Sequence, residues 1–340
     1  MADRRTALAE AVAVVAGGAA LPPSLATAAL REVMDGEAPS AQVGALLAML
    51  HLRGETADEV AAFAGCMRER AIRVDAPEGA IDLCGTGADA AGTFNVSTVT
   101  SFVVAGAGVP VAKHGNRAVT SRCGSADLVE ALGVPLEVGP DVVARSIRET
   151  GFGFIFAPAY HPALRHAMPV RRELPIRTVF NLLGPLASPA LVRRQLLGVS
   201  DARLLPLLAG ALSRLGVERA MVVHAADGLD ELSLAGPNRA LLVEGDDIVE
   251  LAIDAADHGL ARAPAAALAG GDAARNREIA LAVLSGEPGP ARDVVLLNAG
   301  AALLVAGRVA TVDDGIEAAA AAIDEGRAAA VLDRVAATSA

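Results

Sequence analysis

A glycine-rich segment, GTGADAAGTFNVST from Gly85 to Thr98, carries the densest set of residues that could bind an anion. Its three glycines directly follow a predicted strand and allow the backbone to approach a ligand closely. The sequence NVST then favours the start of a helix, whose unpaired N–H groups and positive dipole end suit phosphate. Neither a Walker A sequence nor G-x-G-x-x-G is present. The segment therefore predicts a phosphate site, with a plain tight connection as the alternative.

A second polar cluster lies between Val111 and Gly133, after another predicted strand. Its members share a polar or cationic side chain, and they are Lys113, His114, Asn116, Arg117 and Arg122. Gly124 and Ser125 then open a predicted helix, and a second helix N-terminus beside cations would serve a second anionic group. A solvated basic turn is the alternative for any one of these residues.

The stretch from Phe156 to Ala190 begins with a proline-rich part that predicts a loop. Its Arg171 could bind a ligand carboxylate, because a guanidinium group donates two parallel hydrogen bonds. His161 and His166 have no third partner at the spacing of metal ligands, which argues against zinc.

Asp230 and Glu231 are adjacent in the sequence GLDELS, which follows a predicted strand. Adjacent acids on a turn are usually just exposed side chains. If these two face the glycine-rich segment, they become oxygen ligands for Mg²⁺, which proteins usually share with substrate phosphates.

Composition argues against nucleic-acid binding. The 340 residues have 29 Lys and Arg against 40 Asp and Glu, a net charge of −11, with 7 Phe, 1 Tyr and no Trp. A broad phosphate-backbone footprint needs a basic surface, and single-stranded nucleic acid needs aromatic stacking platforms. Any phosphate that the chain handles is therefore expected to be bound locally, by a loop or a metal.

Cysteine use predicts reduced thiols in a cytoplasmic protein, because Cys66, Cys84 and Cys123 are odd in number and outside any CxxC pattern. No membrane span is expected, since the longest uncharged stretch, Thr93 to Ala112, contains several polar side chains. Glu10 interrupts the apolar run near the N-terminus, which favours a helix over a targeting segment.

The elements that must position these residues change in character near residue 75. The first seventy residues predict short amphipathic helices: a stripe that ends at Asp35-Gly36, a helix from Ser40, and a helix that begins with a Thr56–Glu59 capping box. Each has one apolar face, which must pack on another helix or on a partner chain.

Beyond residue 75 the sequence predicts strands that alternate with helices. The predicted strands are Ile81–Cys84, Val109–Lys113, Phe154–Phe156, Leu196–Val199, Ala220–His224 and Ala240–Val243. The predicted helices include Ser125–Leu132, Asp201–Leu215 and Val294–Ala306. Such alternation predicts an α/β domain with a mainly parallel central sheet flanked by helices, joined to the small all-helical N-terminal domain.

Four ordered motifs resemble the anthranilate phosphoribosyltransferase family of tryptophan biosynthesis. They are GTGxDxxGTxNxST, KHGNRxxxSxxGSADxxEALG, HPAxxxxxxVRxxLxxRTxFNxLGPLxxPA and GLDE. The helical start, Gly36 to Thr56, is similar too, so the resemblance covers essentially the whole chain. Ala88 and Pro175 replace glycines that are usual in the family, which leaves the geometry of their loops open.

The resemblance implies transfer of the phosphoribosyl group of phosphoribosyl pyrophosphate (PRPP) to the amine of anthranilate, with release of pyrophosphate. It implies Mg²⁺ as the cofactor, with two ions per active site, held by Ser97, Asp230 and Glu231. No general acid or base is implied, because positioning and metal assistance suffice. The implied PRPP-binding residues are Gly85, Thr86, Gly87, Asp89, Thr93, Asn95, Ser97, Thr98, Lys113 and Ser125.

The implied anthranilate-binding residues are Gly85, Asn116, His161 and Arg171. The family further implies a helical domain of residues 1–72, joined in space by about 166–186, an α/β domain of residues 73–340, and a homodimer formed through the helical domain. Two alternatives stay open at this point: an enzyme similar to pyrimidine nucleoside phosphorylases, and a non-catalytic nucleic-acid-binding relative of the same fold.

Overall fold

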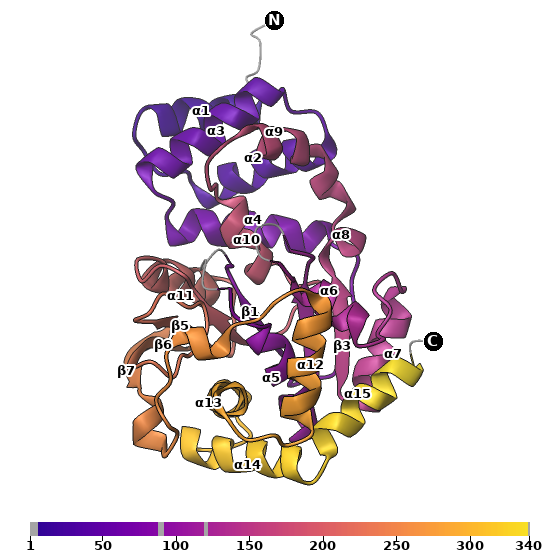
Figure 1. The fold of residues 1–340 in the computed structure, drawn as a ribbon. Coiled ribbons are helices and arrows are strands. Elements are labelled where there is room, and N and C mark those ends of the chain that lie inside the picture. The colour runs from indigo at the N-terminus through magenta and orange to yellow at the C-terminus, as the bar shows by residue number, and fades with distance from the viewer. Residues whose placement is uncertain (1–5, 88–91, 119–121, 339–340) are drawn as a thin grey trace, which may run out of the picture.

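The computed structural model describes residues 6–87, 92–118 and 122–338, and its centre is one seven-stranded sheet. The strand order is β3-β2-β1-β4-β5-β6-β7, in which β1 to β5 are parallel and β6 and β7 are antiparallel. Helices cover both faces of the sheet, and a helical bundle lies above one end of it (Figure 1). The predicted fold class is confirmed.

The strands lie where the sequence predicts them, with ends that differ by a few residues. They are β1 Ile81–Gly85, β2 Val111–Gly115, β3 Phe152–Phe156, β4 Arg194–Gly198, β5 Arg219–Ala225, β6 Asn238–Glu244 and β7 Asp247–Ile253. No strand was predicted at β7. This strand forms the edge of the sheet, and most of its side chains are exposed although its sequence, DIVELAI, is largely apolar.

Alternate side chains of the strands pack into two different cores. Ile81 and Leu83 face a core shared with α5 (Val96–Gly106) and α13 (Pro290–Val305). Leu197 and Val222 face the opposite core, which contains α11 (Leu204–Arg214) and the N-terminal helices. This two-sided burial explains the nearly continuous apolar character of the parallel strands.

The N-terminal bundle consists of four helices: α1 Ala7–Ala16, α2 Pro23–Asp35, α3 Ser40–Arg53 and α4 Ala57–Arg70. The predicted capping box is present, because Thr56 accepts from the Glu59 N–H while the Glu59 carboxylate accepts from the Thr56 N–H. Glu59 is fully buried and also accepts from the Leu21 N–H at 2.7 Å and pairs with Arg53. One carboxylate thus joins three segments of the bundle.

Short helices replace the loop predicted after Phe156, so that prediction is wrong. They are α8 Ala157–Tyr160, the 3₁₀-helix Pro162–His166, α9 Met168–Glu173 and α10 Phe180–Leu186. In the first three, proline occupies the first turn, where a missing N–H costs no hydrogen bond. α9 and α10 lie among the N-terminal helices in Figure 1, and Val170 and Leu183 belong to their core. The division into residues 1–72 with about 166–186, and 73–340, stays a prediction that these contacts support.

The remaining helices complete the α/β part. They are α6 Ser125–Ala131, α7 Pro140–Thr150, α12 Ala273–Leu284, α14 Val312–Asp324, α15 Arg327–Thr338 and the 3₁₀-helices Ala255–His258 and Ala265–Leu268. Among the residues that the structure describes, no helix has both the length and the apolar character needed to cross a membrane.

Candidate active site

The candidate site lies at the carboxyl ends of β1 and β4, in the middle of the sheet. The chain passes from β1 to β2 and β3 on one side, and then returns to β4 on the other side of β1. Open parallel sheets bind ligands outside such a switch point, because the connections leave in opposite directions there. Gly85 ends β1 and pairs with Gly198, which ends β4.

The two strand-end glycines make room for the turn that carries the acid pair. A Cβ atom at Gly85 would lie 2.2 Å from Oδ2 of Asp230, and one at Gly198 would lie 1.5 Å from the Asp230 carbonyl oxygen. A side chain at Gly198 would therefore push the turn away, and one at Gly85 would displace the Asp230 carboxylate. The GLDE turn thus packs directly on the glycine-rich segment, as the sequence analysis required for a metal role.

Both carboxylates of this turn accept hydrogen bonds from the backbone of the glycine-rich segment. Asp230 Oδ2 accepts from the Gly87 N–H at 2.6 Å, and Glu231 Oε1 accepts from the Ser97 N–H at 3.1 Å. Ser97 is the second residue of α5, so its N–H belongs to the positive end of that helix. The Gly87 and Ser97 N–H groups thus form two positions that can bind an anion, and a carboxylate of the protein occupies each of them.

Lys113 places a cation under the same site. Its side chain is 1% exposed and donates to the Leu83 carbonyl at 2.6 Å and to Ser97 Oγ at 3.3 Å. Burial lowers the pKa of Lys113, and nearby acids, Asp82 among them, oppose that shift. Burial and the neighbouring Asp230 raise the pKa of Glu231, while Lys113 lowers it. Burial is the larger cause of this rise, and the repulsion between the two acids adds to it.

These charges fit Mg²⁺ better than a transition metal. The donors at the site are carboxylate and hydroxyl oxygens, which hard cations prefer. A dication would stabilise the ionised carboxylates and so oppose both the burial and the repulsion from Asp230 that raise the pKa of Glu231. The described residues contain no group of three or more His, Cys, Asp or Glu side chains placed to hold a metal, so most ligands would come from a substrate or from water.

Asn95 precedes α5 and links three segments through its side-chain amide. Its Nδ2 donates to the Cys123 carbonyl at 3.0 Å, and its Oδ1 accepts from Asn276 Nδ2 at 2.9 Å. Asn276 lies on α12 and is 1% exposed. Sequence reasoning missed Asn276, because it is 181 positions from Asn95 along the chain and an isolated asparagine carries no motif signal.

The other predicted PRPP-binding residues surround this centre with different exposure. The Thr86 N–H donates to the Gly198 carbonyl at 3.0 Å, and Thr93 forms a β-bridge with Ala269. Ser125 Oγ donates to the Asn116 carbonyl at 3.3 Å at the start of α6. Thr98, in contrast, is fully buried in the first turn of α5. Asp89 and Ala88 lie outside the described residues.

The predicted anthranilate-binding residues differ in burial and lie on different elements. His161 is buried against His114, with 5.2 Å between the ring centroids, and burial lowers the pKa of His161 to about 4. Asn116 is exposed at the end of β2. Arg171 lies on α9, with its guanidinium 5.0 Å from the centre of the Phe180 ring. No hydrogen bond within the described part of the chain joins Arg171 to His161 or Asn116.

Burial lowers the pKa of the Arg171 guanidinium, and among the described residues no carboxylate pairs with it. Its hydrogen-bond partner is Met168 Sδ at 3.6 Å, a weak acceptor. A half-buried, unpaired cation is costly, so this side chain suits an anionic group that arrives with a ligand. Pro175 is exposed just after α9.

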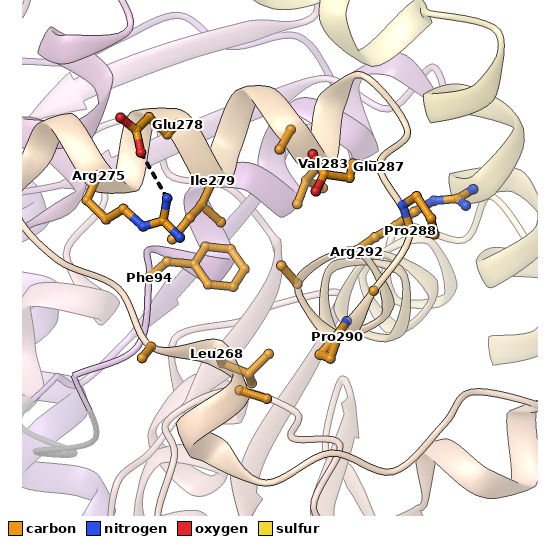
Figure 2. A pocket seen from close by; sticks show the side chains of 15 residues that line it. Phe94, Leu268, Arg275, Glu278, Ile279, Val283, Glu287, Pro288, Pro290 and Arg292 are labelled. Carbon is orange, nitrogen blue, oxygen red and sulfur yellow. Dashed lines mark hydrogen bonds and ion pairs between the residues drawn. The ribbon is translucent and has the colours of Figure 1, made fainter.

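A cavity of about 430 Å³ lies outside the strand-end site, between α12 and the start of α13. Figure 2 shows Phe94, Leu268, Ile279 and Val283 around it, with the Arg275–Glu278 ion pair on one side. Phe94 directly precedes Asn95, so the cavity adjoins the end of the glycine-rich segment without sharing the acid pair.

Two family models match the chain. The helical-bundle domain of a glycosyl transferase family matches residues 10–71, and the a/b domain of the same family matches residues 77–329. Curated relatives match nearly end to end. The chain is 51% identical to anthranilate phosphoribosyltransferase from Rubrobacter xylanophilus, over 96% of each chain. It is 52% identical to that of Chloroflexus aggregans, over 97% of this chain and 98% of the relative.

Solved structures agree with these relatives. Anthranilate phosphoribosyltransferase from Thermus thermophilus superposes with a TM-score of 0.92 at 44% identity, over 96% of this chain and 98% of that one. The Saccharomyces cerevisiae enzyme in complex with PRPP and Mg has a TM-score of 0.89 at 26% identity, over 98% of this chain and 97% of that one.

Proposed function

The chain belongs to the anthranilate phosphoribosyltransferase family, and we propose that it transfers the phosphoribosyl group of PRPP to the amine of anthranilate. The products are N-(5-phosphoribosyl)anthranilate and pyrophosphate, in the biosynthesis of L-tryptophan. The enzyme is a pentosyltransferase, and its substrates are small molecules.

The observation that carries this proposal is the pair of carboxylates bound to the glycine-rich segment. The Gly87 and Ser97 N–H groups each hold a carboxylate oxygen of the GLDE turn. These N–H groups also suit phosphate oxygens, which prefer glycine-rich turns and helix N-termini. We infer an exchange on binding: the diphosphate of PRPP takes both N–H groups, and Asp230 and Glu231 turn toward the metal.

Mg²⁺, with two ions per active site, is the proposed cofactor, held by Asp230, Glu231 and Ser97. When bound, the metal neutralises charge on the departing diphosphate. The yeast relative was solved in complex with PRPP and Mg, which supports this assignment. Lys113, which donates to Ser97 Oγ at 3.3 Å, is proposed to place a positive charge beside the diphosphate.

The rest of the PRPP site is proposed from the glycine-rich segment and α6. Backbone groups of Gly85, Thr86 and Gly87 line the diphosphate, with Asp89 in the same loop. Thr93, Asn95, Ser97 and Thr98 line the phosphates at the start of α5, and Ser125 does so at the start of α6. Thr98 acts there by packing and by fixing the start of α5, because its side chain is buried and its N–H donates to the Asn95 carbonyl at 3.1 Å.

Anthranilate is proposed to bind between Asn116, Gly85 and His161, with its carboxylate toward Arg171. The ribosyl carbon gains positive character as the diphosphate leaves, as in other glycosyl transfers. The aromatic amine is weakly basic and neutral at pH 7, so it attacks without a strong general base. Burial keeps His161 neutral, since it lowers the pKa of that imidazole to about 4. Positioning of the two substrates therefore supplies most of the rate.

Two further predictions concern the oligomeric state and the location in the cell. We expect a homodimer through the helical domain and a cytoplasmic location. The second rests on the cysteines, which are odd in number and lie outside any CxxC pattern.

The direct test is to incubate the purified protein with PRPP, Mg²⁺ and anthranilate and to follow the loss of anthranilate fluorescence. The proposed function requires turnover that depends on all three components and stoichiometric release of pyrophosphate. Loss of PRPP without consumption of anthranilate would point to another acceptor and would contradict the proposal.

A further inference from the structure

Asn95 occupies the N-cap position of α5 but does not cap the helix. Asparagine is among the best N-cap residues, because its side-chain oxygen accepts from the second or third N–H of the helix. Here those N–H groups belong to Ser97 and Thr98, and the described structure has no side-chain cap bond at Asn95. Instead the Ser97 N–H binds Glu231 at 3.1 Å. Other contacts of the Asn95 amide must therefore keep it away from the N–H groups of the first turn of α5.

Hydrogen bonds to both Nδ2 and Oδ1 fix the orientation of the Asn95 amide. The Cys123 carbonyl can only accept, so the NH₂ of Asn95 points toward it at 3.0 Å. The Gly271 N–H can only donate, so Asn276 turns its oxygen toward Gly271 at 2.7 Å. The NH₂ of Asn276 must then face Asn95 Oδ1, at 2.9 Å. Asn276 therefore binds the oxygen that would cap α5, and the Cys123 thiol donates to the same oxygen at the longer distance of 3.3 Å.

We propose that Asn276 is a positioning residue that holds Asn95 out of the capping position, so that the Ser97 N–H is available to Glu231 in the ligand-free protein and, by exchange, to an incoming anion. That the anion is the diphosphate of PRPP rests on the proposed function. Asn276 is 1% exposed and both polar atoms of its side chain bind protein groups, so we place it outside direct contact with substrate.

The surrounding backbone keeps Asn276 in place. A Cβ atom at Gly270 would lie 2.7 Å from Asn276 Oδ1 and 2.7 Å from the Phe94 backbone, so only glycine lets these segments meet. The Gly270 N–H also donates to the Gly92 carbonyl at 2.9 Å. The turn before α12 and the end of the glycine-rich segment therefore pack directly against each other.

Loss of the Asn276 amide removes the shorter of the two hydrogen bonds to Asn95 Oδ1 and leaves the one from the Cys123 thiol. Asn95 should then be able to cap its own helix and compete with the ligand for the Ser97 N–H. The near-isosteric Asn276→Leu adds no charge, and Asn276→Ser is the milder variant if the leucine variant folds poorly. We expect PRPP affinity, measured by calorimetry with Mg²⁺ and without anthranilate, to fall about three- to tenfold, as for one hydrogen bond. The KM for anthranilate at saturating PRPP should change less than about twofold.

The control for simple loss of packing is Val283→Ala. Val283 is also buried on α12, but it lines the cavity in Figure 2 and takes no part in the hydrogen bonds of Asn95. This variant should lower the melting temperature and leave PRPP affinity unchanged. Equal weakening of PRPP binding in Val283→Ala and Asn276→Leu would overturn the proposal.

A double-mutant cycle tests whether Asn276 affects PRPP binding through Asn95. In an Asn95→Ala background no amide can swing onto the helix, so Asn276→Leu should have no further effect on PRPP affinity. A full additional loss in that background contradicts the proposal.

A ligand-free crystal structure of Asn276→Leu tests the inference even if the wild-type protein fails to bind PRPP, an outcome that would reject the proposed function by itself. Asn95 Oδ1 within hydrogen-bond distance of the Ser97 N–H supports the inference, and an unmoved Asn95 overturns it.

Discussion

At the scale of single residues, Arg171 is the side chain whose surroundings most clearly call for a ligand. It is half-buried, stacks on Phe180, and has no carboxylate partner among the described residues. Arg171→Ala should raise the KM for anthranilate by the equivalent of about 1.5–3 kcal/mol, the typical cost of a lost charge-assisted contact, and spare the KM for PRPP. Steady-state kinetics with each substrate varied in turn measures both constants.

Arg172 is the matched control, because it follows Arg171 on α9 and is exposed. Arg172→Ala should leave both KM values within about twofold of the wild type, as surface substitutions usually do. An unchanged KM for anthranilate in Arg171→Ala would refute the carboxylate assignment.

The acid pair belongs to the same scale. The double variant Asp230→Asn, Glu231→Gln keeps the size of both side chains but removes two anionic oxygen ligands. Its apparent Mg²⁺ affinity and its turnover at ordinary Mg²⁺ should fall by more than the loss of one neutral hydrogen bond, about 1 kcal/mol, would cause. A Mg²⁺ titration of initial rates is the measurement. Wild-type turnover with an unaltered Mg²⁺ titration would contradict a metal-binding role for Asp230 and Glu231.

His114 and His161 give a prediction about pH. Burial lowers the pKa of His114 to about 3 and that of His161 to about 4, whereas a histidine in an unfolded chain titrates at about 6.5. The unfolded chain therefore binds protons first as the pH falls. The stability that these neutral rings contribute is complete above about pH 6.5 and is lost as the pH falls toward 4 and then 3.

Replacing both rings with glutamine should flatten the loss of unfolding free energy between about pH 6.5 and 4, measured by urea denaturation at each pH. His51→Gln, at an exposed position on α3, should leave the wild-type slope in place. Identical slopes for the double variant and the wild type would show that the two rings do not carry this pH dependence.

At the scale of elements, the fit of the GLDE turn over the end of β4 decides where the carboxylates lie. In Gly198→Ala the new Cβ would lie 1.5 Å from the Asp230 carbonyl, which is backbone and cannot rotate away. We expect the free energy of unfolding to fall by about 1–3 kcal/mol, as for other overpacked sites, and Mg²⁺-dependent PRPP binding to weaken. Denaturant titration and calorimetry measure the two effects.

Gly65→Ala is the control for a glycine-to-alanine change as such. Gly65 lies inside α4, and a Cβ there meets no described heavy atom within 4 Å. Alanine should stabilise that helix by up to about 1 kcal/mol and leave PRPP binding unchanged. Normal PRPP binding in a destabilised Gly198→Ala would mean that the turn tolerates the displacement.

At the scale of the whole molecule, exposed apolar side chains indicate where a second copy would bind. Leu52 on α3 is 87% exposed, whereas Val249 on the edge strand β7 is 53% exposed. We expect sedimentation at micromolar concentration to give twice the 34.2 kDa chain mass. Leu52→Lys should shift the protein toward monomer and Val249→Lys should not. Dissociation by Val249→Lys instead would place the interface at the sheet edge.

Local signals in the sequence were sufficient for much of this architecture. The strand, glycine-rich turn and helix start at Gly85–Thr98 follow from apolar runs, glycine and helix-start preferences, all of which act within a few residues. The Thr56–Glu59 capping box is equally local. The alternation of strands and helices indicated the α/β class, because buried parallel strands must be apolar on both faces.

How these pieces meet depends on packing in three dimensions. Gly87 and Asp230 are 143 residues apart along the chain, and Asn95 and Asn276 are 181 apart, so neither contact follows from local preference. Burial is likewise a property of the fold, and burial is what lowers the pKa of Lys113 and of His161. The residue types of the site are thus readable from the sequence, but its charges and their partners arise when distant segments exclude water together.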